Sequence, residues 1–168
     1  MNEELCCLAA EVGRMLVHRG ETVAVAESST GGLIAAALLS VPGASAFVRG
    51  GAVVYTSESK RILVGMSDQQ FSDARAATEL HATHLAAAVR RTLSATWGIG
   101  ETGAAGPTGN RYGDPAGHSC VAVVGGAIAS RTLSTGVSAR PENMVRFALG
   151  ALQLLADTLT SIVPADGD

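Results

Sequence analysis

The sequence of 168 residues has few aromatic side chains and no excess of basic ones. Aromatic residues make up 4% of the chain and charged residues 16%, against 47% apolar residues, which argues against extended disorder. The formal net charge is −3 and the arginines are scattered. No basic stripe is therefore available to neutralise a run of phosphates, so we expect no nucleic-acid partner. One small anionic ligand remains possible, because it needs only one or two arginines or a helix N-terminus.

Cysteines and long apolar runs are equally scarce. The three cysteines, Cys6, Cys7 and Cys120, cannot all pair with one another, and two are adjacent within a helical pattern, which favours reduced thiols. Residues 1–5 are acidic where a signal peptide would be basic, and no apolar run has the length of a membrane span. These features predict a cytoplasmic protein that does not bind membranes.

The histidines give no sign of a metal site. His18, His81, His84 and His118 stand at no spacing typical of zinc ligands with a cysteine or a carboxylate. We therefore expect no metal and no other cofactor. Because His81 and His84 fall in a predicted helix, they are interpreted as members of its solvated face.

Apolar periodicity predicts one domain, residues 1–163, built from alternating helices and strands. The expected helices cover residues 3–18, 33–39, 78–97 and 141–162, with a further one beginning near 56, and the expected strands cover 22–26, 51–55, 99–102, 119–124 and 127–133. The last two strands flank Gly125-Gly126 and are expected to form a hairpin at which the sheet turns antiparallel. This order predicts an α/β fold, a three-layer α/β/α sandwich with a mixed, mostly parallel sheet. Residues 164–168 lack periodicity and are expected to form a disordered tail.

Three polar segments follow predicted strands, at residues 27–32, 55–60 and 102–118. Ligands of open α/β sheets bind beyond the carboxyl ends of the strands, so these segments form the candidate site. In the first, Ser28–Thr30 precede Gly31-Gly32 and a helix, where free backbone N–H groups could hold a phosphate or a developing oxyanion. The same residue types are ordinary at helix N-caps, so this segment alone is more often structural.

The second and third segments add ionisable groups. Lys60, if desolvated near the sheet, would have a lowered pKa and could act as general base for a serine, whereas a solvated surface lysine is the commoner case. Ser57 and Lys60 also match a short Ser-x-x-Lys pattern, which is a weak signal. Tyr55 either packs on the core or turns its hydroxyl into the site. Glu101 falls on a short interior strand, where an ionised carboxylate needs a partner.

Several motifs in order resemble the CinA C-terminal domain family, which includes the nicotinamide-nucleotide amidohydrolases, or NMN deamidases. The resemblance covers roughly residues 5–160 and rests on several motifs that occur in the family's order. The matching segments are Ala26-Glu-Ser-Ser-Thr-Gly-Gly32, Pro42-Gly-Ala-Ser-Ala-Phe47, Arg49-Gly-Gly51, Val54-Tyr55 with Lys60, and Thr102-Gly-Ala-Ala-Gly-Pro107.

The resemblance implies a serine nucleophile at Ser28, a lysine base at Lys60 and a nearby hydroxyl at Tyr55. It also implies a substrate-binding set. Two acidic residues behind that set are candidates to support the site, one of them on the interior strand described above. The binding set is Ser29, Thr30, Gly31, Gly32, Gly103, Gly106, Arg146 and, as a looser match, Arg140; the acidic residues are Glu27 and Glu101. In this set an arginine of the last helix would hold a 5′-phosphate.

The implied reaction is deamidation of nicotinamide mononucleotide to nicotinate mononucleotide and ammonia, through an acyl-enzyme on Ser28. Two alternatives stay open. The chain could be a non-catalytic module that binds a nucleotide or a partner through the same pocket, or an amidase for a different carboxamide. The expected partner is a small nucleotide, and a small domain with apolar helices favours a homo-oligomer.

The chain also departs from the family pattern. The family usually has cysteine at the position of Ser29, a Lys-Pro-Val-Gly-Thr-Val type of segment at residues 114–119, and a less acidic residue at Glu101. These changes bear on the pocket rim and on substrate preference. Longer members carry an amino-terminal pterin-binding-like domain outside this pattern, and we expect activities that depend on that domain to be absent.

Overall fold

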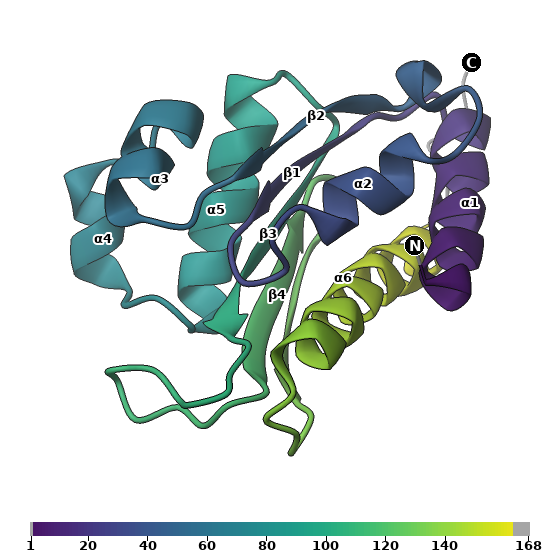
Figure 1. The fold of residues 1–168 in the computed structure, drawn as a ribbon. Helices are drawn as coiled ribbons and strands as arrows, with labels where there is room; N and C mark the ends of the chain where they lie inside the picture. The colour runs from purple at the N-terminus through teal and green to yellow at the C-terminus, as the bar shows by residue number, and fades with distance from the viewer. Residues whose placement is uncertain (1, 163–168) are drawn as a thin grey trace.

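The computed structural model describes residues 2–162, which form a five-stranded sheet with helices on both faces (Figure 1). The strands are β1 (Val23–Glu27), β2 (Val48–Val53), β3 (Trp97–Ala104), β4 (His118–Val124) and β5 (Ile128–Ser134). The helices are α1 (Glu3–His18), α2 (Leu33–Leu39), α3 (Ser57–Val64), α4 (Asp68–Asp73), α5 (Glu79–Thr92) and α6 (Arg140–Ser161), with a short 3₁₀ turn, η1 (Ala44–Ala46). The predicted tail, residues 164–168, lies outside the described residues.

The sheet is mixed, with strand order β2-β1-β3-β4-β5. Strand β1 runs parallel to both of its neighbours, β2 and β3, while β4 and β5 continue the sheet in antiparallel pairs. The predicted three-layer α/β/α sandwich is therefore confirmed, including the antiparallel hairpin at its end. Within residues 2–162 no helix is both long and apolar enough to cross a membrane.

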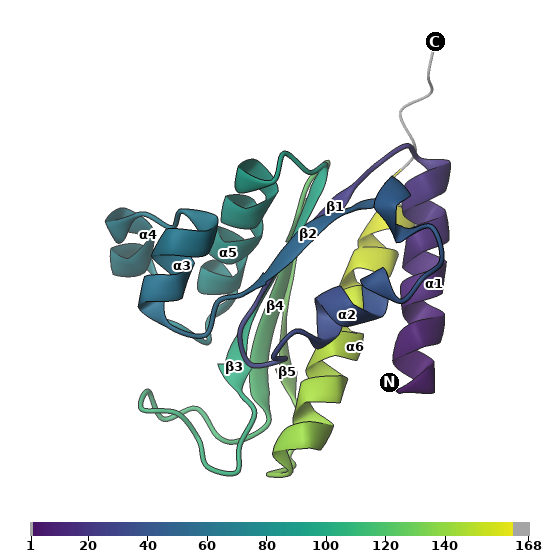
Figure 2. The same ribbon diagram turned by 45° about the horizontal axis from the view of Figure 1, so that its top comes forward.

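The two larger apolar clusters lie on opposite faces of the sheet and hold the layers together, and a small third one joins Ala82 of α5 to Cys120 and Ala122 of β4. Helices α1, α2 and α6 cover one face and α3, α4 and α5 the other, as the edge-on view of Figure 2 shows. The first cluster centres on Trp97, Phe47 and Leu152, and the second on Leu85 and Val89, all almost fully buried. Because both faces are covered, β1 is buried at every position.

Strand β3 and helix α5 approach each other unusually closely, and two glycines make this possible. A methyl group at Gly98 would overlap the backbone oxygen of Ala86, and one at Gly100 would overlap that of Ala82. The absence of side chains at these positions lets the helix lie directly on the strand. This contact fixes the helix that carries His81 at a set height above the sheet.

The structure departs most from the sequence prediction at two boundaries and at one helix. Strand β2 begins at Val48 rather than at residue 51, because the chain already pairs with β1 there despite Gly50 and Gly51. Helix α5 ends at Thr92 rather than 97, since Ser94 adopts a left-handed conformation at φ 49°. Helix α4 was not predicted, although Ser67 and Gln70 form a capping box at its start, which is a readable signal.

Candidate active site

The candidate site lies where β1 and β3 end side by side. From β1 the chain passes through α2 to β2 on one side, and then through α3, α4 and α5 to β3 on the other side. The two connections cover opposite faces of the sheet (Figure 2). The crevice beyond the carboxyl ends of two such strands is where ligands bind in doubly wound sheets.

All three polar segments meet in one cavity at this crevice, which we call the main chamber. Its volume is about 480 Å³, within the usual range for small-molecule sites. Ser28 comes from the segment after β1, Tyr55 and Lys60 from the segment after β2 and the first turns of α3, and Gly103 from the end of β3. The full lining is Ser28, Tyr55, Ser57, Lys60, Ala76, Ala77, Thr102, Gly103, Asn110, Arg111 and Tyr112.

Glu101 holds the segment that contains Ser28. Its carboxylate is fully buried on β3, and Oε2 accepts the backbone N–H groups of Ser28 at 3.0 Å and Thr30 at 3.1 Å. Oε1 accepts the hydroxyls of Ser29 and of Ser119, the latter at 2.8 Å. The partner that an interior carboxylate requires is thus a set of backbone and hydroxyl donors, and the segment is fixed from below.

Three departures from the family pattern converge in this contact. The resemblance implies that the family usually has cysteine at Ser29, a less acidic residue at Glu101 and valine at Ser119. In the structure both serine hydroxyls donate to the same carboxylate oxygen of Glu101. The three residues therefore form one polar cluster beneath the segment Ser28–Thr30, in which each serine hydroxyl donates to the glutamate carboxylate.

Glu27 supports the same segment from the other strand. It ends β1 fully buried, and its carboxylate accepts the backbone N–H groups of Ile34 at 3.1 Å and Ala35 at 2.9 Å at the start of α2. Gly32, the N-cap, has no side chain to do this. The Thr30 hydroxyl lies 2.6 Å from Glu27 Oε2 and 3.0 Å from Glu101 Oε2, so its single proton serves one of them at a time. Burial raises the pKa of Glu27.

Lys60 is desolvated, as the base hypothesis requires. Its side chain is only 4% exposed, on the first turns of α3, where Thr56 caps the helix. Burial lowers the pKa of the Lys60 amine, and the negative charge of Glu101 acts in the opposite direction. Its hydrogen-bond partner is Nε2 of His81, at 3.1 Å from Nζ.

The interpretation of His81 as a solvated residue is wrong. His81 is 1% exposed, because it lies on the face of α5 that packs toward the sheet. Its Nδ1 lies 3.0 Å from the backbone oxygen of Ala74. Burial, together with the positive charge of Lys60, lowers the pKa of His81 to about 4. His84 is half-buried, with Nδ1 3.2 Å from the backbone oxygen of Gln70.

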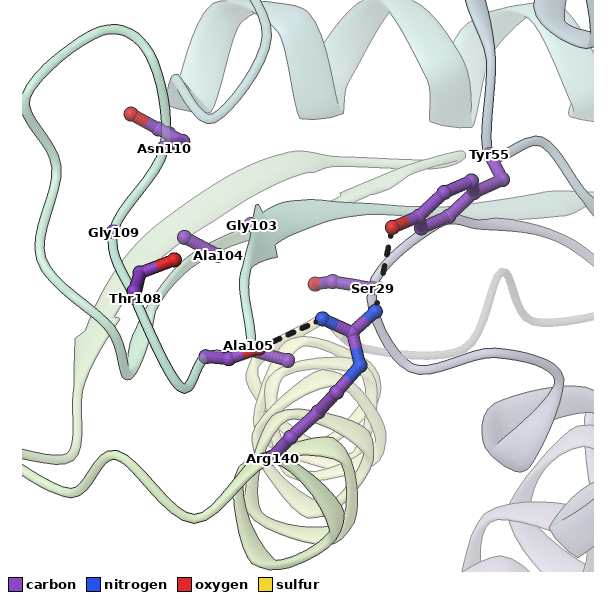
Figure 3. Close-up of a pocket in the computed structure, with 10 residues that line it drawn as sticks. Ser29, Tyr55, Gly103, Ala104, Ala105, Thr108, Gly109, Asn110 and Arg140 are labelled. Atoms are coloured by element: carbon purple, nitrogen blue, oxygen red, sulfur yellow. Dashed lines mark hydrogen bonds between the residues drawn. The ribbon is translucent and has the colours of Figure 1, made fainter.

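A second cavity of about 200 Å³ adjoins the main chamber and is shown in Figure 3. Arg140 lies at one side of it, where Nη1 donates to the backbone oxygen of Gly106 at 2.9 Å and Nη2 to the hydroxyl of Tyr55 at 3.4 Å. Tyr55 is 63% exposed and turns its hydroxyl into the site rather than into the core. Ser29 and Gly103 also line this cavity.

Of the remaining predicted binding residues, some line a cavity and others do not. Gly106 lines the cavity of Figure 3. The N–H of Gly31 donates to the backbone oxygen of Ser28 at 3.3 Å, within the turn, and Gly32 starts α2. Arg146 lies on the exposed part of α6 and pairs with Glu142. It lines neither cavity, so the structure brings Arg140 to the site but not Arg146.

The long segment between β3 and β4 is tied down rather than loose. Arg75 makes two hydrogen bonds to the Asp114 carboxylate, at 2.7 and 3.0 Å, and this guanidinium lowers the pKa of Asp114 to about 2. Asn110 closes the turn by accepting the N–H groups of Tyr112 and Asp114. Asn110, Arg111 and Tyr112 of this segment thereby form one wall of the main chamber.

Comparison with known proteins shows the family. The sequence profile of the CinA C-terminal domain matches residues 6–159. A CinA-like protein of Anaeromyxobacter sp. (strain Fw109-5) is 41% identical over 150 residues, and one of Desulfosudis oleivorans is 38% identical over 149. The alignments cover 88% of this chain in both cases, and 37% and 36% of the relatives. The chain belongs to the CinA C-terminal domain family, and it spans between 28% and 37% of the length of such curated relatives.

Solved structures share the fold over nearly the whole chain. The competence/damage inducible protein CihA from Agrobacterium tumefaciens superimposes with a TM-score of 0.87 at 29% identity, covering 96% of this chain and 98% of that one. A CinA superfamily protein from Klebsiella pneumoniae 700603 gives a TM-score of 0.88 at 26% identity, covering 96% and 100%.

Proposed function

We propose that this chain is a serine amidohydrolase that removes ammonia from the carboxamide of nicotinamide mononucleotide. The observation that carries the proposal is the shared chamber: Ser28 and a desolvated Lys60 line one cavity at the ends of β1 and β3. A serine becomes a nucleophile when a neighbouring group takes its proton, and a lysine can do so when burial lowers its pKa. Family membership supports the same assignment.

Ser28 is free to react. Among the described residues its hydroxyl makes no hydrogen bond, whereas its backbone N–H is fixed by Glu101. The side chain is 9% exposed, at the wall of the main chamber. The nucleophile is thus held by its backbone while its oxygen stays available to a substrate, the arrangement that orientation effects in catalysis require.

The reaction divides into two balanced halves. Ser28 Oγ attacks the carboxamide carbon while the neutral Lys60 amine takes the hydroxyl proton, and the resulting ammonium then gives that proton to the departing nitrogen, which leaves as ammonia. In the second half, water attacks the acyl-enzyme and passes a proton through Lys60 to Ser28 Oγ. The products are ammonia and nicotinate mononucleotide, and no electrons are exchanged.

Two groups are suited to stabilise charge on the substrate. The N–H of Ser29 has no acceptor among the described residues, and an N–H directly after a nucleophile is a common oxyanion donor. Arg140, beside the hydroxyl of Tyr55, keeps guanidinium donors available for the 5′-phosphate. The cavity of Figure 3 would then take the phosphate end of the nucleotide, and the main chamber its carboxamide.

The test is ammonia release by purified protein given nicotinamide mononucleotide, with nicotinamide and NAD as comparison substrates. We expect ammonia from the mononucleotide, and its loss in Ser28→Ala and Lys60→Ala, each by at least about a hundredfold because general-base catalysis contributes that much or more. Ser57→Ala is the matched control, because Ser57 lines the same chamber and should retain activity.

Other outcomes point elsewhere. Binding of the mononucleotide without ammonia release, unaffected by Ser28→Ala, would replace the amidase with a nucleotide-binding module. Ammonia from another pyridine or purine carboxamide, still dependent on Ser28, would keep the reaction class and change the substrate. Activity that needs Ser57 instead of Ser28 would move the nucleophile to the Ser-x-x-Lys pair.

A further inference from the structure

The buried contact between Lys60 and His81 has a direction that the surrounding atoms fix. A carbonyl oxygen only accepts, so the nitrogen of His81 that faces Ala74 carries the ring proton, at a distance of 3.0 Å. The other nitrogen, Nε2, then presents a lone pair to Lys60 Nζ at 3.1 Å. Lys60 is therefore the donor in this hydrogen bond, whether the amine is charged or neutral.

The imidazole itself is held in place by its surroundings. Its ring packs against Phe71 of α4, with ring centroids 6.0 Å apart. The backbone N–H of His81 donates to the Thr78 hydroxyl that caps α5, at 3.3 Å. A lysine side chain has four rotatable bonds and can place its nitrogen in many positions. A fixed hydrogen-bond acceptor therefore decides where that nitrogen lies.

We propose that His81 is the positioning residue of Lys60. Its Nε2 lone pair accepts one N–H of the amine, so that the remaining N–H groups or lone pair on Nζ face the chamber that contains Ser28. The inference rests on the proposed amidase function and adds a residue to it. His81 is not the base, because its only free lone pair already receives Lys60 and its low pKa keeps it neutral.

The other charged groups near the pair do not replace this acceptor. Glu101 of β3 acts on Lys60 through its charge, and its oxygens are occupied by donors from Ser28 to Thr30 and from Ser119. His84 lies near His81 on α5, and its Nδ1 donates to the backbone oxygen of Gln70 at 3.2 Å. Arg61, Arg75 and Arg111 line the cavity of about 250 Å³ beside the pair, and they carry donors only.

This arrangement predicts the direction in which the pKa of Lys60 changes when the His81 imidazole is removed. An ammonium is a stronger donor than an amine, so the imidazole favours the protonated form of Lys60. In His81→Leu the pKa of Lys60 should fall further. In His81→Gln, whose longer side chain again reaches the ε position, it should return toward the wild-type value. His84→Gln, on the same helix, is the matched control.

The experiment measures two quantities against pH. The first is kcat/KM for the mononucleotide, whose acid limb should move down by about half a pH unit or more in His81→Leu, with kcat about tenfold lower and KM nearly unchanged. The second is the rate at which acetic anhydride acetylates Lys60, followed by mass spectrometry of its peptide. Its midpoint should move in the same direction, and both should recover in His81→Gln and stay unchanged in His84→Gln.

An unmoved acetylation midpoint in His81→Leu, or a loss of kcat that His81→Gln does not recover, overturns the inference. Should His81→Leu fail to fold, His81→Asn takes its place, because its short amide can reach Ala74 but not Lys60. The acetylation arm needs no turnover. Wild-type protein that releases no ammonia would therefore contradict the proposed function. The acetylation midpoint would still test the effect of His81 on Lys60.

Discussion

At the scale of single residues, the buried carboxylate of Glu101 decides whether the segment Ser28–Thr30 keeps its shape. Two backbone N–H groups, of Ser28 and Thr30, converge on Oε2, and hydroxyls fill the other oxygen. An N–H cannot turn round to accept, but a hydroxyl can. A glutamine at this position therefore fits in one orientation only, with its oxygen toward the two N–H groups.

We predict that Glu101→Leu lowers the free energy of unfolding by several kcal/mol, because each buried N–H left without a partner costs about 1–3 kcal/mol. Glu101→Gln should cost about 1 kcal/mol, since the hydroxyls of Ser29 and Ser119 can accept from its amide. Urea unfolding of the two variants and wild type measures the difference. Equal losses in both variants would mean that the charge, not the acceptor geometry, holds the segment.

The sequence indicated some of these residues and missed others for identifiable reasons. A carboxylate on an interior strand required a partner, and the structure supplies one, although nothing local pointed to Ser119. His81 could have been placed correctly, because it shares helical spacing with Leu85 and Val89, which are buried on the same face of α5. Counting only large apolar side chains shifted the predicted face by one residue, to Leu80, which is 49% exposed.

At the scale of elements, the close packing of β3 on α5 sets the distance between Glu101, which lies on β3, and His81, which lies on α5. The backbone oxygen of Ala82 occupies the space where a side chain at Gly100 would be, and no flexible atom there can yield. Overpacking of a rigid site usually costs about 1–3 kcal/mol. Since Ala82 follows His81 on α5, a displaced helix would also pull the imidazole away from Lys60.

Gly100→Ala should therefore lower both the unfolding free energy, by about 2 kcal/mol or more, and the turnover of the mononucleotide. Gly126→Ala is a suitable control, because the nearest atom to its added methyl, Cδ1 of Ile162, is 3.7 Å away. Thermal unfolding and ammonia release on the same preparations test this. A stable Gly100→Ala enzyme with normal activity would show that α5 can shift without cost to the site.

Helices and strands were easier to predict from the sequence than their boundaries and the way their connecting segments come together. Periodicity identified the apolar faces of α1 and α6, because long amphipathic patterns repeat over several turns. It gave β2 too late a start, since Gly50 and Gly51 weaken a strand pattern that is completed only by pairing with β1. The rule for open α/β sheets indicated that the three polar segments form the site, whereas the strand order that brings them into one chamber is not contained in local patterns.

At the scale of the whole molecule, the proposed substrate extends over both cavities. This can be tested by comparing KM for the mononucleotide with KM for the riboside that lacks the phosphate. Arg140→Gln should raise KM for the mononucleotide about tenfold or more, because a hydrogen bond to a charged group contributes about 1.5–3 kcal/mol. It should leave KM for the dephosphorylated riboside nearly unchanged. Arg146→Gln, from an arginine paired with Glu142, should change neither. The reverse pattern would assign the phosphate to Arg146, as the family resemblance implies.

The stability of the molecule should also carry the signature of its buried histidine. The pKa of His81 falls from 6.5 to about 4 on folding, so between these values the unfolded chain binds more protons than the folded one. The stability that this neutral histidine preserves is fully present above pH 6.5 and is lost as the pH falls toward 4. The loss amounts to about 3 kcal/mol.

Neighbouring groups shape the same curve, so a difference must be measured. The raised pKa of Glu27 works in the opposite sense, adding stability as the pH falls, while the contribution from the depressed pKa of Asp114 is lost mainly between pH 3.8 and about 2. Both contributions cancel when urea unfolding of wild type and His81→Leu is compared from pH 7 to pH 4. The gap between the two proteins should shrink by about 3 kcal/mol across this range. A constant gap would mean that His81 stays accessible to protons in the folded state, and would remove the reason for treating it as a neutral acceptor for Lys60.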